Sequence, residues 1–305
     1  MRIAIASGKG GAGKTVLTSS LHAVWPEAHV LVDADVEAPN LHLFLHPILR
    51  TSRKVLLSVP MAVSSACTSC GACREICRYS AIARFGEKIR LFSDMCHGCG
   101  GCFKVCPMQA LEEGFRELGV VESGALSDGT PFFSGRTRAG EVLTPPVIRS
   151  LFDELEAVLG REKRECDVLI DCPPGVSCPA VTVARRADLV LLAVDPTPFG
   201  LEDFRIAADA MKTLNIPTAC VLNRTDLPGN CGGDERAEAS IREFGLPLLG
   251  RIPFSREGAL LLSRGSLLFS DENGLRARFC AIASALKAFA ANPDFSGGPF
   301  PREEV

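Results

Sequence analysis

The stretch that decides the fold is Gly8-Lys9-Gly10-Gly11-Ala12-Gly13-Lys14-Thr15. It follows a short apolar run, Arg2-Ile3-Ala4-Ile5-Ala6, that suits a buried parallel strand, and it precedes a helical pattern over residues 14–24. A strand, a glycine-rich loop and a helix are the context of a phosphate-binding loop, in which backbone N–H groups face phosphate oxygens. We expect Lys14 to reach the β- and γ-phosphates and Thr15 to bind Mg²⁺.

Strand-like apolar runs recur along the chain, with helical patterns between most of them. The expected strands lie at residues 2–6, 29–33, 54–59, 167–171, 188–194, 218–222 and 248–252. The expected helices include residues 14–24, 146–159, 178–187, 200–214, 234–244 and 273–291. This alternation predicts an α/β fold, a mostly parallel sheet flanked by helices, with the ligand site at the carboxyl ends of the strands.

Eight of the 14 cysteines form two copies of one pattern, C-x2-C-x2-C-x3-C, and the copies are 29 residues apart. The spacing is that of bacterial two-cluster ferredoxins, in which the fourth cysteine of each run binds the other cluster. The pattern predicts one [4Fe–4S] cluster on Cys67, Cys70, Cys73 and Cys106, and a second on Cys77, Cys96, Cys99 and Cys102.

Disulfides and zinc are the alternatives for these cysteines. Disulfides need an oxidising compartment, whereas the expected first strand leaves no room for an export signal before it. Zinc sites use C-x2-C pairs with longer spacers. The other six cysteines show no paired spacing, and buried structural thiols are the default expectation for them; whether Cys172 and Cys178 have a redox role stays open.

Composition sets wide bounds on the function. The chain has 305 residues, 47% of them hydrophobic and 23% charged, which is typical of a soluble globular protein. A net charge of −3 gives no sign of nucleic-acid binding, and no apolar run approaches the roughly 20 residues of a membrane span. We expect a cytoplasmic protein.

The positions of the motifs suggest a host domain interrupted by a redox module. We expect residues 1–60 and 113–291 to form the phosphate-binding domain and residues 61–112 to form an inserted ferredoxin-like domain. The module would leave after a strand at residues 54–59, and residues 118–144 would return as short antiparallel strands. Residues 292–305 are expected to form a disordered tail.

With Lys9, the loop resembles the deviant Walker A motif, G-K-G-G-x-G-K-[ST], of the MinD, ParA, Mrp and nitrogenase iron protein family. The resemblance implies a face-to-face dimer of two ATP-binding subunits. It further implies that Lys9 reaches the phosphates bound by the partner subunit, and that the backbone from Gly8 to Val16 surrounds the phosphates of ATP.

Later segments resemble other motifs of the same family. Asp33-Ala34-Asp35 resembles the family's switch I, which implies that Asp35 orients the attacking water and that Asp33 lies near Mg²⁺. Asp171-Cys172-Pro173-Pro174-Gly175 resembles switch II, which implies Mg²⁺ contact for Asp171 and phosphate sensing by the Gly175 amide. Asn223-Arg224 and Arg251-Ile252-Pro253-Phe254 resemble the segments that hold the adenine base.

Together these features resemble the MinD-superfamily ATPases that contain an inserted ferredoxin domain. The resemblance implies a slow, partner-stimulated ATPase in which a nucleotide-dependent homodimer or heterodimer gates electron transfer to a partner protein. An Mrp-like cluster carrier is an alternative, although no C-x2-C pair follows Cys178. A MinD/ParA-like positioning switch with redox sensing is a second alternative, although the sequence has no basic stripe and no basic amphipathic helix.

Overall fold

The computed structural model describes residues 1–162, 166–269 and 274–292. Its main sheet has nine strands in the order β11-β10-β9-β1-β8-β2-β7-β6-β3, and the strands from β11 to β7 are all parallel. The parallel strands are β1 (Arg2–Ala6), β2 (His29–Asp33), β7 (Pro131–Thr137), β8 (Asp167–Asp171), β9 (Leu189–Val194), β10 (Thr218–Thr225) and β11 (Leu248–Pro253). The α/β class expected from the sequence is confirmed.

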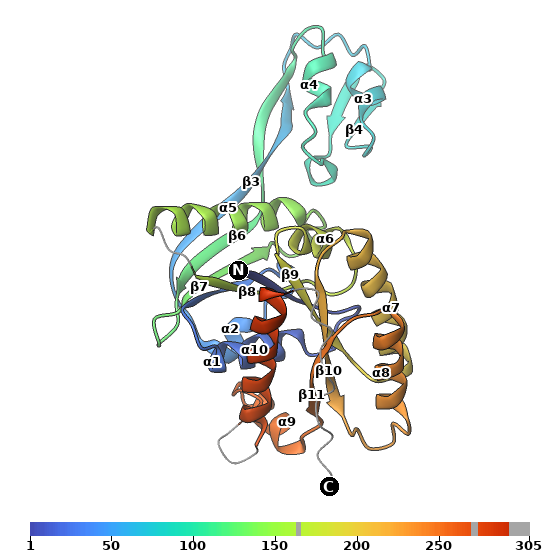
Figure 1. The fold of residues 1–305 in the computed structure, drawn as a ribbon. Coiled ribbons are helices and arrows are strands. Elements are labelled where there is room, and N and C mark those ends of the chain that lie inside the picture. Colours follow the sequence, from blue (N-terminus) through green and yellow to red (C-terminus); the bar gives the residue numbers. More distant parts are fainter. Residues whose placement is uncertain (163–165, 270–273, 293–305) are drawn as a thin grey trace.

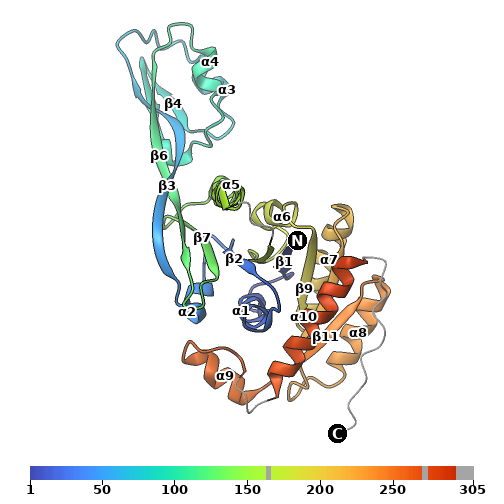
Figure 2. The same ribbon diagram turned by 60° about the vertical axis from the view of Figure 1, so that its left-hand side comes forward.

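Helices cover both faces of this sheet (Figures 1 and 2). They are α1 (Lys14–Val24), α2 (Leu41–Leu45), α5 (Pro145–Glu162), α6 (Cys178–Ala184), α7 (Pro198–Thr213), α8 (Gly233–Glu243), α9 (Arg256–Ser263) and α10 (Leu275–Ala291). The short helices α2 and α9 were not expected from the sequence. The predicted tail begins at the last described residue, and the rest of it, residues 293–305, lies outside the described residues.

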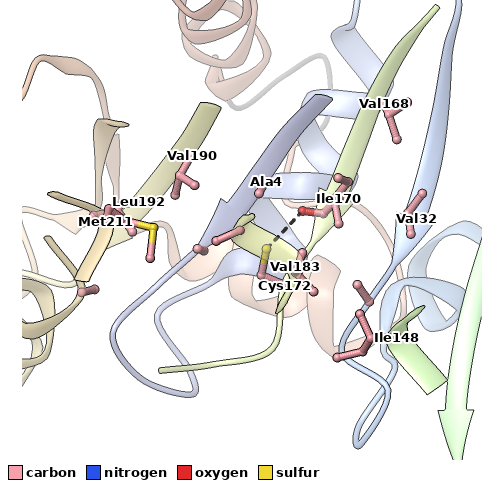
Figure 3. Packing of buried hydrophobic residues seen from close by; sticks show 14 of the residues in the cluster. Ala4, Val32, Ile148, Val168, Ile170, Cys172, Val183, Val190, Leu192 and Met211 are labelled. Carbon is pink, nitrogen blue, oxygen red and sulfur yellow. Dashed lines mark hydrogen bonds between the residues drawn. The ribbon is translucent and has the colours of Figure 1, made fainter. Parts of the chain in front are cut away.

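The strands alternate their side chains between two hydrophobic cores, as the pleat of a sheet requires. Ile3 and Ile5 of β1 pack with α1 and α10 on one face. Ala4 faces the other core, where Val32, Ile170 and Cys172 pack against α5, α6 and α7 (Figure 3). Helix α10 buries its apolar side in the first core, as expected. Within the described ranges, no helix has the length and apolar character needed to cross a membrane.

The expectation of buried thiols outside the two runs is only partly right. Cys172 and Cys220 are buried, and burial raises the pKa of both thiols. Cys178, Cys231 and Cys280 are exposed, so the default was wrong for these three.

A long antiparallel ribbon forms the other end of the sheet. It pairs β3 (Ile48–Val63) with β6 (Leu111–Ala125), so both strands are much longer than the segments expected from the sequence. Only Gly119–Ala125 of β6 pairs with β7, and Gly119 lies opposite Thr137, the last residue of β7. The eight residues from Leu111 to Leu118 therefore extend past the carboxyl edge of the sheet, by roughly 27 Å at about 3.4 Å per residue.

The far end of this ribbon carries a small unit (Figures 1 and 2). It contains α3 (Ala72–Ile76), α4 (Gly101–Val105) and a hairpin of β4 (Ile82–Phe85) and β5 (Lys88–Leu91). Its backbone repeats the 29-residue period of the cysteines. Positive φ angles recur at Ser69 and Gly98, at Gly71 and Gly100, and at Ser80 and Gln109. The two cysteine runs thus have the same local conformation.

A histidine pair lies where α1 approaches the start of β2. His29 Nδ1 lies 2.8 Å from the carbonyl oxygen of Glu27, and its Nε2 lies 2.9 Å from His22 Nδ1. His29 Nδ1–H must donate to the carbonyl oxygen, so Nε2 of the neutral His29 ring is the acceptor and His22 Nδ1–H is the donor between the two rings. Burial and the neighbouring His29 lower the pKa of His22 from 6.5 to about 4, against the attraction of Asp128.

Replacing His22 with glutamine is expected to reduce the acid sensitivity of folding. Below pH 6.5 the unfolded state binds a proton that the folded state rejects, so stability falls as the pH decreases from 6.5 toward 4. The loss attributable to His22 is roughly 2–3 kcal/mol over that range. Urea unfolding of the anaerobically purified protein measures it, with the exposed His42→Gln as control. Equal pH dependence in both variants would contradict the assignment.

Candidate functional site

The phosphate-binding loop joins β1 to α1 in a conformation that requires glycine. Gly13 has φ 95°, and a Cβ there would lie 2.2 Å from Nδ2 of Asn223. A Cβ at Gly8 would lie 1.9 Å from the carbonyl oxygen of Asp203. The loop therefore packs closely against α7 and the end of β10, with the Lys14 side chain buried at the start of α1.

Three carboxylates gather beside this loop, because β2 and β8 are neighbours and Asp33 pairs with Asp171 in register. Asp171 accepts a hydrogen bond from Thr15 Oγ1 at 2.6 Å. Burial raises the pKa of Asp171 to about 7, and burial together with Asp171 raises that of Asp33. Burial also raises the pKa of Asp35. A divalent cation would offset the cost of these buried charges.

The donor set fits a magnesium–nucleotide complex better than a stand-alone metal site. Within the described ranges, no group of three or more histidine, cysteine or acidic side chains is arranged to hold a metal ion. Mg²⁺ commonly takes one or two carboxylates together with phosphate oxygens and water. Thr15, Asp33 and Asp171 are placed to supply the protein share of such a shell.

Lys9 points to a partner within its own chain. Its Nζ lies 3.1 Å from Asp195 Oδ2 and 3.4 Å from Thr197 Oγ1. Asp195 is buried at the end of β9, and Arg224 Nη1 lies 3.9 Å from the same carboxylate oxygen. No local pattern in the sequence indicated that Asp195 would pair with Lys9.

The remaining expected residues lie at the same carboxyl edge. The Gly175 amide donates to the carbonyl oxygen of Ser7 at 3.0 Å, beside the phosphate loop. The side-chain amide of Asn223 donates to the carbonyl oxygen of Ala12 at 2.8 Å, so this side chain supports the loop. Pro253 ends β11 opposite Thr225.

The eight cysteines of the two runs line two cavities. One, here the distal cavity, is lined by Cys67, Cys70, Cys73 and Cys106 and encloses about 360 Å³, open solvent included. The other, the proximal cavity, is lined by Cys77, Cys96, Cys99 and Cys102 and encloses about 410 Å³ on the same measure. Each cavity thus draws three cysteines from one run and the fourth from the other.

Backbone amides point at three of the sulfurs. Ser69 N lies 3.4 Å from Cys67 Sγ, and Gly98 N lies 3.4 Å from Cys96 Sγ, one repeat later. Ala110 N lies 3.2 Å from Cys106 Sγ. Such amide donors stabilise negative charge on sulfur and tune the potentials of bound clusters. Among the described residues of the two runs, no three cysteines are arranged to hold a single metal ion. A cubane needs sulfurs spread around a cavity, whereas a single zinc ion needs them about 2.3 Å from one point.

Comparison with known proteins gives a consistent picture of the host domain. The family model for the CobQ/CobB/MinD/ParA nucleotide binding domain matches residues 3–268. An uncharacterized protein of Methanocaldococcus jannaschii is 30% identical over 226 residues, which cover 73% of this chain and 78% of that protein. A second uncharacterized protein of the same organism is 28% identical over 228 residues, or 73% of this chain and 80% of its own length.

Solved structures share the fold at low identity. The septum site-determining protein MinD of Pyrococcus horikoshii, complexed with Mg-ADP, has a TM-score of 0.56 at 18% identity. The match covers 96% of this chain and 98% of that MinD chain. A chain of the MinC:MinD cell division protein complex of Aquifex aeolicus has a TM-score of 0.57 at 16% identity, and the match covers 99% of this chain and 98% of that one.

Proposed function

The chain belongs to the CobQ/CobB/MinD/ParA family of nucleotide-binding domains, and from this premise we propose that it is a Mg²⁺-dependent ATPase that gates electron transfer. In this proposal residues 61–112 form a redox module with two [4Fe–4S] clusters. A nucleotide-dependent dimer, of two copies or of this chain with a related ATPase, controls electron transfer from the module to a partner protein.

The nucleotide half of the proposal assigns a role to each residue of the carboxyl edge. Lys14 and the loop amides hold the phosphates, while Thr15 and Asp171 hold the Mg²⁺, which neutralises the developing charge of phosphoryl transfer. Asp35 orients the attacking water, and Lys9 of the partner subunit completes the site. For that, Lys9 must leave Asp195, 3.1 Å away, as the dimer forms.

One observation carries the redox half: the crossed lining of the two cavities. Four cysteines surround each cavity, and the fourth always comes from the other run. Ferredoxins with two clusters use this arrangement, whereas independent zinc sites have no reason to exchange a ligand. A [4Fe–4S] cluster in each cavity would supply one-electron chemistry.

The geometry of the ribbon supports a link between the two halves. It extends past the carboxyl edge of the sheet, which is also the edge that carries Lys14, Asp35 and Asp171. Figure 1 shows the module at the end of this ribbon, so in our proposal nucleotide-dependent closure reaches the module through the ribbon.

We expect nucleotide to shift the potential of at least one cluster. The test is an anaerobic redox titration followed by electron paramagnetic resonance, without nucleotide, with Mg·ADP and with a non-hydrolysable Mg·ATP analogue. A shift with the ATP analogue, together with faster electron transfer to an artificial acceptor, is the expected result. Cluster potentials and electron-transfer rates that do not change with nucleotide would refute gating. Release of iron–sulfur to an apo-acceptor, faster with ATP, would favour the carrier function instead.

A further inference from the structure

We propose that the buried ion pair of Arg116 and Glu141 couples the switch I loop, residues 33–36, to the proximal cavity. The cluster on Cys77, Cys96, Cys99 and Cys102 is then the one whose potential follows the nucleotide. This inference rests on the proposed function and identifies the residues that carry its regulation.

The proximal cavity lies against the ribbon. Ser58 and Pro60 of β3 belong to its lining. A Cβ at Gly98, between Cys96 and Cys99, would lie 2.4 Å from Cδ1 of Leu57, so this cysteine loop packs closely on β3. A movement of the ribbon at Leu57 would therefore be felt by this cysteine loop.

Arg116 connects the ribbon to this cysteine loop. It lies on the part of β6 that extends past the sheet, and its side chain is only 7% exposed. Nη2 donates to the carbonyl oxygen of Cys96 at 3.1 Å, and Nη1 pairs with Glu141. Nε is buried and has no hydrogen-bond partner among the described residues. Two contacts therefore hold the guanidinium, one to the cysteine loop and one to Glu141.

Glu141 is anchored in the loop that joins β7 to α5. Its carboxylate accepts hydrogen bonds from the backbone amides of Val142 and Leu143, at 3.1 and 2.9 Å, and its side chain is 2% exposed. Arg138 Nε lies 3.5 Å from the same carboxylate. Because this carboxylate is held by its own loop, a shift of the loop moves the group that positions Arg116.

The same loop is tied to switch I. Both the amide and the hydroxyl of Thr137 donate to the carbonyl oxygen of Val36, at 2.8 and 3.1 Å, and Val36 directly follows Asp35. A movement of Asp35 toward a γ-phosphate would pull on Thr137, then on Glu141, then on Arg116. Thr137 connects to Glu141 through the next residue, Arg138, whose carbonyl oxygen accepts a hydrogen bond from the Glu141 amide at 3.1 Å, and Glu141 pairs with Arg116, so the route is continuous through chain neighbours and contacts.

The electrostatics single out the proximal cluster. One repeat before Arg116 the residue is Glu87, which accepts a hydrogen bond from the Ser69 hydroxyl through its backbone carbonyl oxygen, and its exposed carboxylate, like the exposed Arg84 near Gly71, is screened by solvent. A buried cation near a cluster favours the reduced, more negative state and so raises the potential. Asp94, which pairs with Arg138, is 79% exposed and its charge is screened by solvent. We therefore expect the proximal cluster to be reduced first.

The test compares Arg116→Met with Lys54→Met, which breaks an exposed ion pair with Glu117 on the same ribbon. Both clusters are titrated by electron paramagnetic resonance with and without the Mg·ATP analogue, and iron content is measured. Arg116→Met should lower the proximal potential, abolish its response to nucleotide and leave the distal potential in place. Lys54→Met should behave as wild type.

The double variant Arg116→Met/Glu141→Gln removes both buried charges. It replaces the single variant in the same titration if the single variant is unstable. A nucleotide response in both Arg116 variants equal to that of wild type would overturn the inference while leaving gating intact. A wild-type protein without any response would overturn gating itself, and this inference with it. A shift of the distal potential alone would also contradict the assignment.

Discussion

Replacing Cys73 with alanine is expected to remove the distal cluster alone, so that bound iron falls from about eight to about four atoms per chain. The reason is the lining of the cavities, in which Cys73 shares a space with Cys67, Cys70 and Cys106. Cys106→Ala should have the same effect, although Cys106 belongs to the second run. Cys77→Ala should instead remove the proximal cluster, although Cys77 belongs to the first run.

Iron and sulfide analysis measures the loss, and the resonance spectrum identifies which cluster remains. Cys231→Ala and Cys280→Ala are the controls, because both thiols are exposed and lie outside the two runs. If Cys106→Ala had the spectrum of Cys102→Ala, each run would hold its own cluster and the crossed arrangement would be wrong. If the anaerobically purified protein contained zinc in place of iron, the redox proposal would be wrong.

The parallel sheet was predictable because its strands are short, apolar and buried on both faces. The ribbon was not, since β3 carries Thr51-Ser52-Arg53-Lys54 in its exposed half, at the edge of the sheet, and Glu112-Glu113-Gly114 follow Leu111 at the start of β6. Exposed side chains on an edge strand or on a projecting ribbon need no apolar alternation, so only the apolar residues 54–59 indicated a strand. The ribbon's length decides where the module lies, and no pattern along the chain indicates that length.

The functional site, like the fold, has parts that local sequence patterns predict and parts that they do not. The phosphate loop, both switches and the two cysteine runs are local patterns whose spacing reflects their chemistry, and spacing can be read along a chain. The pairs of Lys9 with Asp195 and of Arg116 with Glu141 join residues distant in sequence. The packing of the strands brings these partners together, so no local sequence pattern predicts either pair. The proposed coupling depends on the second of these pairs.

Replacing Lys9 with alanine is expected to lower the rate of ATP hydrolysis by about 10³-fold, the effect of losing a cation that acts in trans on the transferred phosphoryl group. Nucleotide binding should persist, because Lys14 and the loop amides remain. The structure shows Lys9 paired with Asp195 of its own chain, so an action within the same subunit is the competing explanation. Steady-state hydrolysis and the binding of a fluorescent ATP analogue measure the two effects separately.

Mixed dimers decide between these explanations. Chains with Lys9→Ala are combined with chains with Asp35→Asn, each inactive alone. If Lys9 acts in trans, a mixed dimer has one complete site, which joins Asp35 of one chain to Lys9 of the other. An equal mixture should then recover about a quarter of wild-type activity, since about half of the dimers are mixed and each has one complete site of two. If Lys9 acts within its own chain, both sites of the mixed dimer are defective and no activity returns.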